Sequence, residues 1–229
     1  MDGLRVPGLE VRVVQRCGST NEELMREGKS GVLLAALEQT AGRGRRGRRW
    51  YSGGVTFSVS AHVGRPAREL AGLSLVAGVA AARALGAQLK WPNDLVLDGA
   101  KLGGILVETR GNFAVIGIGI NCRRDPALER RVRRAVAFID MEPAPIIAGV
   151  ASELLAALAV FEREGLEPLR AEWERRHAHD GARVRVRLAD GRVLTGIARG
   201  LDADGGLRLD TRGGVRAVRS GQVLSARPA

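Results

Sequence analysis

The sequence predicts an α/β protein, with a mixed, largely antiparallel sheet flanked by helices (an α+β arrangement) and a small β-barrel after it. Apolar and alternating segments interleave with helical patterns up to residue 176, whereas only short alternating strands follow residue 182. The stretch 177–181 separates the two patterns. A chain of 229 residues with 45% hydrophobic content can build one sizeable domain and one small one. We therefore expect a first domain over residues 1–178 and a second over residues 179–229.

The first domain opens with a strand, a helix and two further strands. Thr20 and Glu23 match a capping box at the start of the helix, and Gly28 follows its last residue. A short apolar run is typical of a buried strand, and a run with period two is typical of a half-buried one. The expected elements are a strand at 11–16, a helix at 20–27, a strand at 32–38 and a strand at 55–60.

A long helix rich in Ala and Leu is expected next, from Pro66 to about Leu85, where Gly86 ends it. Its faces are apolar nearly all round, which is typical of a helix in the centre of a domain. Asp98-Gly99 is a tight-turn signal within the strands that follow. The remaining elements are strands at 88–91, 95–97, 105–109 and 113–118 and helices at 126–134, 143–164 and 167–176.

The second domain is expected to be a barrel of short strands joined by glycine-containing turns. A unit of about 50 residues is marginally stable alone, so it should lean on the larger domain. The strands are expected at 183–188, 193–197, 207–210 and 215–218.

Composition excludes several function classes. The two cysteines, Cys17 and Cys122, lie far apart in the sequence, which fits a reducing cytoplasm and argues against a disulfide scaffold or a zinc site. No apolar run reaches the roughly 18 residues of a membrane helix, and no signal peptide is visible. The net charge of +11 suggests nucleic acid, yet only three of the 36 basic residues are lysines. This skew toward arginine indicates a compositional bias, which weakens the charge argument and gives each retained lysine more weight.

The nine residues from Gly42 to Trp50 form the most informative segment. They contain five arginines and three glycines and end in a tryptophan. Glycine lets the backbone approach a ligand closely, and arginine offers a forked donor to carboxylates and phosphates. We interpret this segment, the arginine–glycine loop, as a binding loop for a small anion that carries an aromatic base. A basic surface loop that contacts nucleic acid is the alternative.

Four shorter motifs also stand out. Each alone has a plain structural interpretation: a helix cap, a turn, a solvated lysine or a tightly packed strand. Together they are harder to dismiss, because three of the four asparagines in the chain fall within them. The motifs are Ser19-Thr20-Asn21, Lys90-Trp91-Pro92-Asn93-Asp94, Lys101-Leu102-Gly103-Gly104-Ile105 and Gly117-Ile118-Gly119-Ile120-Asn121.

The ordered combination of these motifs with Gln39 and the arginine–glycine loop resembles the biotin protein ligases, the biotin–[carboxylase carrier] ligases. The resemblance covers nearly the whole chain. It implies a catalytic fold of the class II synthetase type and a C-terminal barrel of the SH3-like kind. It also implies two half-reactions. Biotin and Mg-ATP give biotinyl-5′-AMP and pyrophosphate, and a lysine of a carrier protein then takes the biotin and releases AMP.

The resemblance also assigns residues to roles, and their chemistry suits those roles. Arginines and a lysine can neutralise a carboxylate and a triphosphate that repel each other. Neutral hydrogen-bonding groups suit the ureido ring of biotin, and an indole can cover adenine. The expected catalytic residues are Lys101, Arg45 and Asp94, the last to orient or deprotonate the incoming amine. The expected biotin contacts are Ser19, Thr20, Asn21, Gln39, Gly42, Arg43, Arg45, Lys101, Gly104 and Gly117. The expected ATP and adenylate contacts are Arg45, Arg48, Trp50, Asn93, Lys101 and Asn121.

The partners follow from the same resemblance. The acceptor is expected to be the biotin carrier protein or domain of an acetyl- or acyl-CoA carboxylase, and Mg²⁺ is expected to bridge phosphate oxygens without a protein cage of its own. Residue 19 lies too near the start for a preceding winged helix-turn-helix, so a monofunctional enzyme without operator binding is expected, cytoplasmic and off the membrane. A monomer and a homodimer both stay open. A lipoate or other acyl ligase is the alternative enzyme, and a nucleic-acid-binding protein is the alternative from another class, although aromatics are scarce at 3%.

Overall fold

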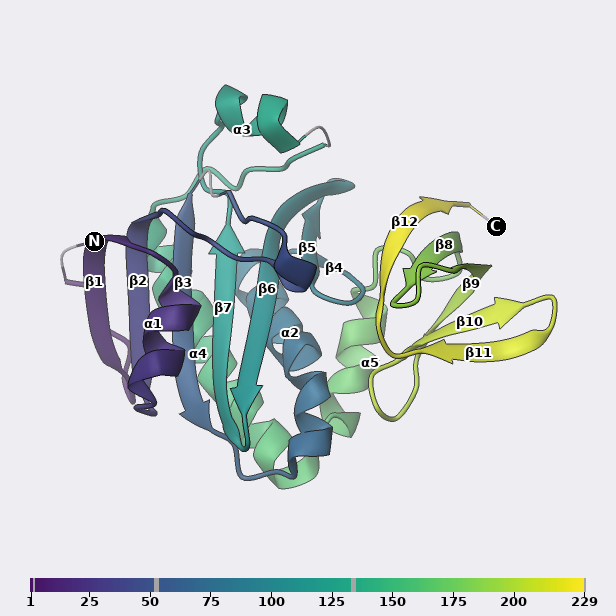
Figure 1. The fold of residues 1–229 in the computed structure, drawn as a ribbon, viewed down its shortest axis with the longest axis horizontal. Coiled ribbons are helices and arrows are strands. Elements are labelled where there is room, and N and C mark those ends of the chain that lie inside the picture. Colours follow the sequence, from purple (N-terminus) through teal and green to yellow (C-terminus); the bar gives the residue numbers. More distant parts are fainter. Residues whose placement is uncertain (2, 52–53, 133–134, 229) are drawn as a thin grey trace.

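The computed structural model describes residues 1, 3–51, 54–132 and 135–228 of the chain. Its larger sheet has seven strands in the order β1-β2-β3-β7-β6-β5-β4 (Figure 1). The β1–β2 pair is parallel and every other pair in this sheet is antiparallel, so the predicted mixed, largely antiparallel sheet is confirmed. The strands are β1 (Glu10–Cys17), β2 (Val32–Gln39), β3 (Val55–His62), β4 (Gln88–Lys90), β5 (Asp94–Leu97), β6 (Ala100–Arg110) and β7 (Phe113–Ile120).

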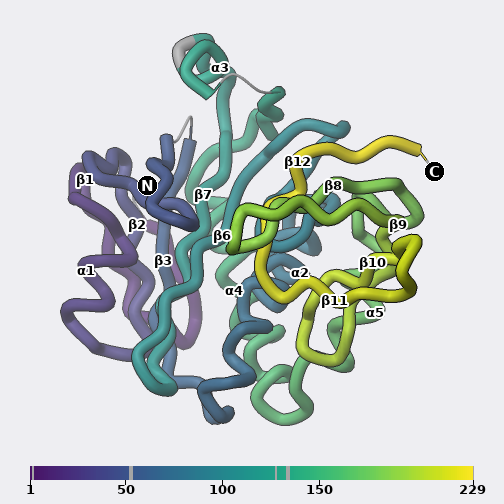
Figure 2. The backbone as a smooth tube through the Cα atoms, turned by 45° about the vertical axis from the view of Figure 1, so that its right-hand side comes forward, coloured from purple at the N-terminus to yellow at the C-terminus, as the bar shows by residue number. Residues whose placement is uncertain are grey.

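Helices lie on both faces of this sheet. Helix α1 lies on the near face in Figure 1, and α2 and α4 lie behind it, while α3 stands beyond one end of the strands. The same separation of α3 from the body of the sheet is visible after the rotation in Figure 2. The helices are α1 (Thr20–Glu27), α2 (Leu73–Leu85), α3 (Pro126–Val132), α4 (Pro143–Glu164) and α5 (Glu167–Arg175), with short 3₁₀ turns η1 (Arg45–Gly47) and η2 (Ala67–Gly72).

The two faces of the sheet differ because strand side chains alternate. On β3, Phe57 and Val59 belong to the apolar core that also contains α2 and α4. Thr56, Ser58 and Ser60 alternate with them along the strand and therefore point to the other face, toward α1. Strand β3 thus presents apolar side chains to one layer of helices and polar ones to the opposite side, where the candidate site lies. That side also holds a small apolar cluster between α1, β2 and β7.

Helix α4 packs in the core beside α2. It has 22 residues and a mean hydropathy of 2.0 over its most apolar window, so by length and composition it could cross a membrane. The expectation that no segment reaches that length is therefore wrong; helix-promoting alanines fill the gaps between its larger apolar residues. Several of those residues, including Ile147, Leu154 and Phe161, are buried against the domain itself.

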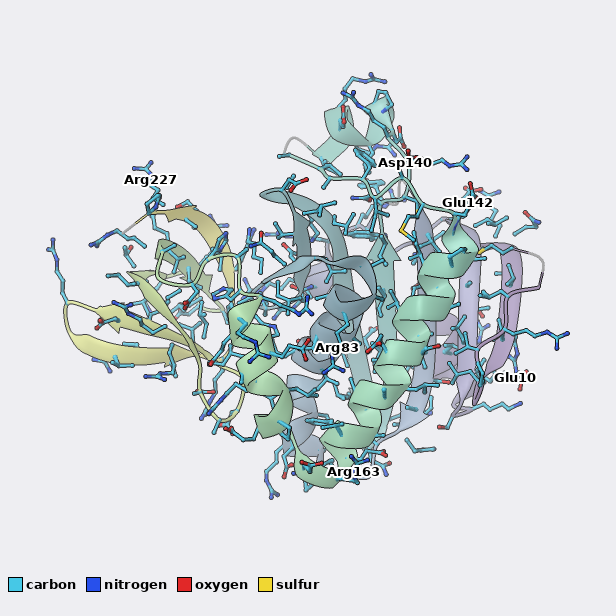
Figure 3. All side chains as sticks on the ribbon, turned by 180° about the vertical axis from the view of Figure 1, so that it is seen from behind. Glu10, Arg83, Asp140, Glu142, Arg163 and Arg227 are labelled. Carbon is cyan, nitrogen blue, oxygen red and sulfur yellow. The ribbon has the colours of Figure 1, made fainter. Side chains whose placement is uncertain are left out.

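An ionic cluster centred on Arg83, which is labelled in Figure 3, joins three helices. Arg83 on α2 pairs with Glu172 on α5 at 2.6 Å and with Glu153 on α4 at 3.5 Å. Hydrogen bonds from Arg83 lower the pKa of the Glu172 carboxyl. Side chains from three separate elements thereby meet at one point.

The C-terminal sheet has five strands in the order β11-β10-β9-β8-β12, all antiparallel. The four predicted strands are present. The fifth, β12, was missed because Val223 and Leu224 follow each other and break the alternation that marks the others. The strands are β8 (Arg183–Leu188), β9 (Val193–Leu201), β10 (Leu207–Thr211), β11 (Gly214–Val218) and β12 (Gly221–Arg227).

Two contacts join the sheets. The indole Nε1 of Trp91, which is buried after β4, donates a hydrogen bond to the carbonyl of Gly205 at 3.1 Å. His177, in the stretch expected to be a linker, forms a bridge with Leu89 of β4 and is 6% exposed. The connection is therefore part of the packed structure. The boundary between residues 178 and 179 stays a prediction.

Three local expectations need correction. Ser19, not Thr20, is the N-cap of α1, and its side chain makes no capping bond because the Ser19–Thr20 pair faces the candidate site. The helix expected from Pro66 starts with the 3₁₀ turn η2, and its α-helical part begins at Leu73. The helix expected to end at Arg134 is helical to Val132, and Arg134 lies outside the described residues.

The buried His177 should make stability depend on pH. Burial lowers its pKa to about 3, and both ring nitrogens lack hydrogen-bond partners among the described residues. Its unfolded pKa is near 6.5, so between about pH 6.5 and 3 only the unfolded chain binds this proton. Stability from this group is therefore complete above about pH 6.5 and falls with decreasing pH, by up to about 1.4 kcal/mol per unit.

Denaturant unfolding at pH 7 and pH 4.5 measures this effect. We expect His177→Phe, which keeps an aromatic ring against Trp173, to lose less stability than the wild type on acidification. His62→Phe is the matched control, because the His62 ring is exposed and also contacts an aromatic side chain. Equal losses in the wild type and His177→Phe would contradict the prediction.

Candidate functional site

A cavity of about 160 Å³ opens on the polar face of the sheet, between the start of α1, strands β6 and β7, and the arginine–glycine loop. Strand β12 of the second sheet closes one side with Gly221, Gln222 and Val223. Thirteen of the predicted site residues line it, so motifs from five separate parts of the sequence meet here. Those residues are Ser19, Thr20, Asn21, Gln39, Arg43, Arg45, Arg48, Trp50, Asn93, Asp94, Lys101, Gly104 and Gly117.

Two predicted residues do not line this cavity. Gly42 lies at the base of the arginine–glycine loop, where an added Cβ would come within 2.8 Å of the Trp50 carbonyl. Asn121 lies behind Lys101, and its amide donates hydrogen bonds to the carbonyls of Lys101 and Ala137, each at 3.3 Å. Both residues therefore shape groups that reach the cavity.

Lys101 owes its position to a bulge in β6. The register with β5 shifts between Leu95 and Val96, so Leu102 is the extra residue. A bulge re-aims the side chains beside it, and Lys101 lies on the cavity side together with Gly104. Its backbone pairs with the segment after α3, where Ala137 N–H donates to the Lys101 carbonyl at 2.9 Å. The ammonium of Lys101 forms a close ion pair with Asp94.

Arg45 is a cavity-lining cation without an ion-pair partner among the described residues. It is partly buried at the cavity, and burial together with the neighbouring Arg46 lowers the pKa of its guanidinium, while Asp94 opposes this shift. No carboxylate in the described part of the chain lies within ion-pair distance of it. A desolvated cation gains interaction energy when an anion arrives. The cavity is therefore built to attract an anionic group.

Two other arginines of the loop have hydrogen-bond partners on distant strands. Arg43 donates to the Glu108 carboxylate at 3.0 Å, and Arg48 donates to the side-chain oxygen of Gln222 at 2.6 Å. Sequence reasoning did not single out either partner. Glu108 lies three residues after the Lys101 motif, whereas nothing in the sequence of β12 marks Gln222.

A buried hydrogen-bond chain lines the inner end of the cavity. The Thr20 N–H donates to the Gln39 side-chain oxygen at 2.7 Å, and the Thr20 hydroxyl lies 2.7 Å from the Ser58 hydroxyl. Ser58 donates to the Asn21 carbonyl oxygen at 2.7 Å, and the Asn21 amide donates to Glu108 at 2.8 Å. Ser58 was also missed, although three polar residues at alternate positions in β3 were a usable signal.

Glycines on β6 and β7 allow two side chains to lie flat on the sheet. A Cβ at Gly117 would fall 2.1 Å from the Asn21 side-chain oxygen, and one at Gly119 would fall 2.4 Å from the Trp50 indole. The indole also lies over Gly104, with the Lys101 nitrogen 5.6 Å from the ring centroid. Its Nε1 has no hydrogen-bond partner among the described residues. Trp50 therefore lies over the bare strands beside the cavity.

The described side chains that line the cavity are not a typical set of metal ligands. Across the described residues no three His, Cys, Asp or Glu side chains come together, and Asp94 is the one carboxylate among the described residues that line the cavity. Any divalent ion here would depend mainly on ligands that a substrate brings.

Comparison with known proteins agrees with this geometry. Residues 13–125 match the biotin/lipoate A/B protein ligase family, and residues 179–224 match the biotin protein ligase C-terminal domain. The chain is 36% identical to a Mycobacterium tuberculosis biotin–[acetyl-CoA-carboxylase] ligase over 95% of its own length and 90% of that protein. It is also 36% identical to the Escherichia coli bifunctional ligase/repressor BirA, covering 96% of this chain and 75% of that protein.

Solved structures extend the likeness to three dimensions. The fold matches a biotin protein ligase from Aquifex aeolicus in complex with biotin and ATP, with a TM-score of 0.82 and 28% identity. The match covers 96% of this chain and 99% of the other. The predicted fold class is therefore confirmed for both sheets.

The position of the Trp50 indole over Gly119 can be tested by adding a side chain at Gly119. In Gly119→Ala the new Cβ would overlap the indole, so Trp50 should leave the sheet. Trp91 and Trp173 are buried, so a rise in acrylamide quenching of tryptophan fluorescence would report Trp50. Gly149→Ala is the matched control, because its Cβ would have 3.7 Å to the nearest atom. If a folded Gly119→Ala protein is quenched to the same extent as the wild type, the Trp50 indole does not lie over Gly119.

Proposed function

The chain belongs to the biotin protein ligase family, and we propose how its residues carry out the reaction. It is an ATP-dependent ligase. The biotin carboxylate attacks the α-phosphate of ATP, which gives biotinyl-5′-AMP and releases pyrophosphate. A lysine amine of a biotin carboxyl carrier protein or domain then attacks the mixed anhydride, forms an amide, and releases AMP.

One observation carries the assignment of residues. Lys101, Asp94 and Arg45 line the same cavity as Thr20 and Gln39, so charged groups and neutral hydrogen-bonding groups occupy one continuous space. Biotin has the same division, with a neutral ureido ring and a carboxylate. We place the ureido ring near Thr20, with Ser19, Asn21, Gln39, Gly104 and Gly117 around it, and the carboxylate near Lys101.

The cations govern the first half-reaction. A carboxylate and a triphosphate repel each other, and a desolvated Arg45 without an ionic partner offsets that repulsion as charge builds up at the α-phosphate. The ammonium of Lys101 is paired with Asp94, and the carboxylate of biotin would share it. Arg43, held by Glu108, and Arg48, held by Gln222, fix the loop over both substrates.

The adenylate is placed at the Trp50 end of the cavity. The amide nitrogen of Asn93 is held by the Ile105 carbonyl at 2.7 Å, which leaves its oxygen to accept from the ligand. Trp50 leaves its seat on Gly119 to cover adenine when the loop closes. Asn121 contributes by holding the Lys101 backbone, and Gly42 by setting the turn that carries Trp50.

Asp94 is assigned to the second half-reaction. Attack requires a neutral amine, whereas a free lysine has a pKa near 10.4. Once Lys101 has turned to the anhydride, the Asp94 carboxylate is available to orient the incoming ammonium and accept its proton.

Magnesium is assigned to the phosphates. One carboxylate beside a triphosphate suits a hard cation that keeps several waters, and the absence of an acidic cluster in the described residues fits that mode. Bound there, Mg²⁺ would neutralise phosphate charge.

We also propose the acceptor, the compartment and the absence of two other partners. We assign the acceptor to an acetyl- or acyl-CoA carboxylase and the enzyme to the cytoplasm, where the free Cys17 and Cys122 stay reduced. We assign it no membrane, because α4 packs in the core. We also propose that it binds no operator DNA. Sedimentation at micromolar concentration distinguishes the monomer from the homodimer.

Exchange of labelled pyrophosphate into ATP tests the first half-reaction. We expect exchange with biotin but not with lipoate, and a loss of about 10²- to 10³-fold in Lys101→Ala, the range for removing one transition-state donor. Lys29→Ala is the matched control, because Lys29 pairs with Glu10 on the opposite edge of the sheet. Full exchange in Lys101→Ala, or exchange with lipoate alone, would contradict the assignment.

A further inference from the structure

A chain of hydrogen bonds with a fixed direction lies at the inner end of the cavity, which two of its members, Thr20 and Asn21, line. The chain runs from Glu108 through Asn21 and Ser58 to Thr20, and its three inner members are almost completely buried. Buried polar groups of this kind must share their protons consistently, because water cannot supply a missing one. The groups at the outer end of the chain therefore determine the direction of donation along it.

The Asn21 amide can lie in one orientation only. One end of it faces the carbonyl oxygen of Leu106 at 3.2 Å and the carboxylate of Glu108 at 2.8 Å. A carbonyl and an ionised carboxylate only accept hydrogen bonds, so this end must be the NH₂ group. The carbonyl oxygen of Asn21 therefore faces Ser58, and Gly117 provides the space for it.

The orientation of Asn21 fixes the proton of Ser58. A serine hydroxyl has a single proton, and Ser58 must donate it to the Asn21 oxygen at 2.7 Å. The Ser58 oxygen then accepts from Thr20, because two hydroxyl oxygens 2.7 Å apart need a proton between them. The Gln39 oxygen, at a longer 3.1 Å from the Thr20 hydroxyl, already accepts the Thr20 N–H.

Thr20 is left without a proton to give. Thr20 lines the cavity, and its hydroxyl oxygen keeps a lone pair, so toward a ligand it can only accept. We propose that the buried chain Glu108–Asn21–Ser58 makes Thr20 an obligatory acceptor, so that the cavity selects a ligand with an N–H at this point. Ser58, which does not line the cavity, and Glu108 are then specificity-determining positioning residues.

The proposal rests on the assignment of biotin to this cavity. The ureido ring of biotin carries two N–H groups, and an acceptor-only threonine suits one of them. A cyclic carbamate, in which oxygen replaces one N–H, would place two acceptors against each other. A site built for a hydrogen bond rejects such an analogue because its own group is left unpaired.

Isothermal titration with biotin and the two cyclic carbamate analogues, one for each nitrogen, tests the proposal. We expect the wild type to bind one carbamate at least about tenfold more weakly than biotin. In Ser58→Ala the Thr20 proton is released and can be donated to the ring oxygen of the carbamate. The ratio of the carbamate Kd to the biotin Kd should therefore shrink by about threefold or more. Ser60→Ala is the matched control: Ser60 is equally buried two residues along β3 but bonds the backbone of Lys29 and Val32.

Glu108→Ala provides a second variant, because its carboxylate is partly exposed and its removal does not open the core. This substitution removes the shorter of the two hydrogen bonds that orient the Asn21 amide and leaves the Leu106 carbonyl as its acceptor. Because Asn21 is then held less firmly, the Kd ratio should move in the same direction as in Ser58→Ala. Any general effect from releasing Arg43 cancels in the ratio. If this Kd ratio is unchanged in both variants, or altered equally in Ser60→Ala, the proposed role of the hydrogen-bond chain is wrong, although biotin binding itself is unaffected. Failure of the wild type to bind biotin would instead overturn the assigned function.

Discussion

The site depends on the close contact of two side chains, Asn21 and Trp50, with the backbone of β6 and β7. Three glycines, at positions 104, 117 and 119, leave a bare surface in the middle of a sheet that is otherwise covered. Asn21 lies on one part of that surface and Trp50 on another, at distances that no Cβ would permit. The polar chain, the loop and the lysine are arranged around these two contacts, and a single methyl group at Gly117 or Gly119 would displace them.

The same surface explains why the two faces of the sheet differ so strongly. Behind it, Phe57 and Ile118 belong to a continuous apolar core with α2 and α4, which keeps the strands in place. On the front face a smaller apolar cluster packs α1 against β2 and β7. Around the cavity itself, position depends on directed hydrogen bonds. A rigid back and a hydrogen-bonded front suit a cavity that must hold polar groups accurately without being filled by the protein's own side chains.

Periodicity predicted most of the fold. The apolar run of β2, the alternation of β3 and the apolar α4 each reflect burial that the local sequence encodes. The order of strands did not follow from it, because pairing such as β3 with β7 joins segments more than fifty residues apart. Strand β12 was missed for a local reason, since Val223 and Leu224 interrupt its alternation. The capping box was wrong because Thr20 is drawn into the polar chain instead.

The site was predictable to the extent that its residues are chemically unusual. Lys101, Asp94 and Arg45 stood out as rare or clustered charges, and they line one cavity. Ser58 and Gln222 are ordinary residue types whose importance comes only from what the fold brings beside them, Asn21 and Arg48. A sequence motif therefore marks groups that meet the ligand, whereas the groups that orient them have to be found by following each buried proton to its acceptor. At Thr20, the hydrogen bonds that lead through Ser58 to Asn21 give a neutral hydroxyl, which could donate or accept, one defined role.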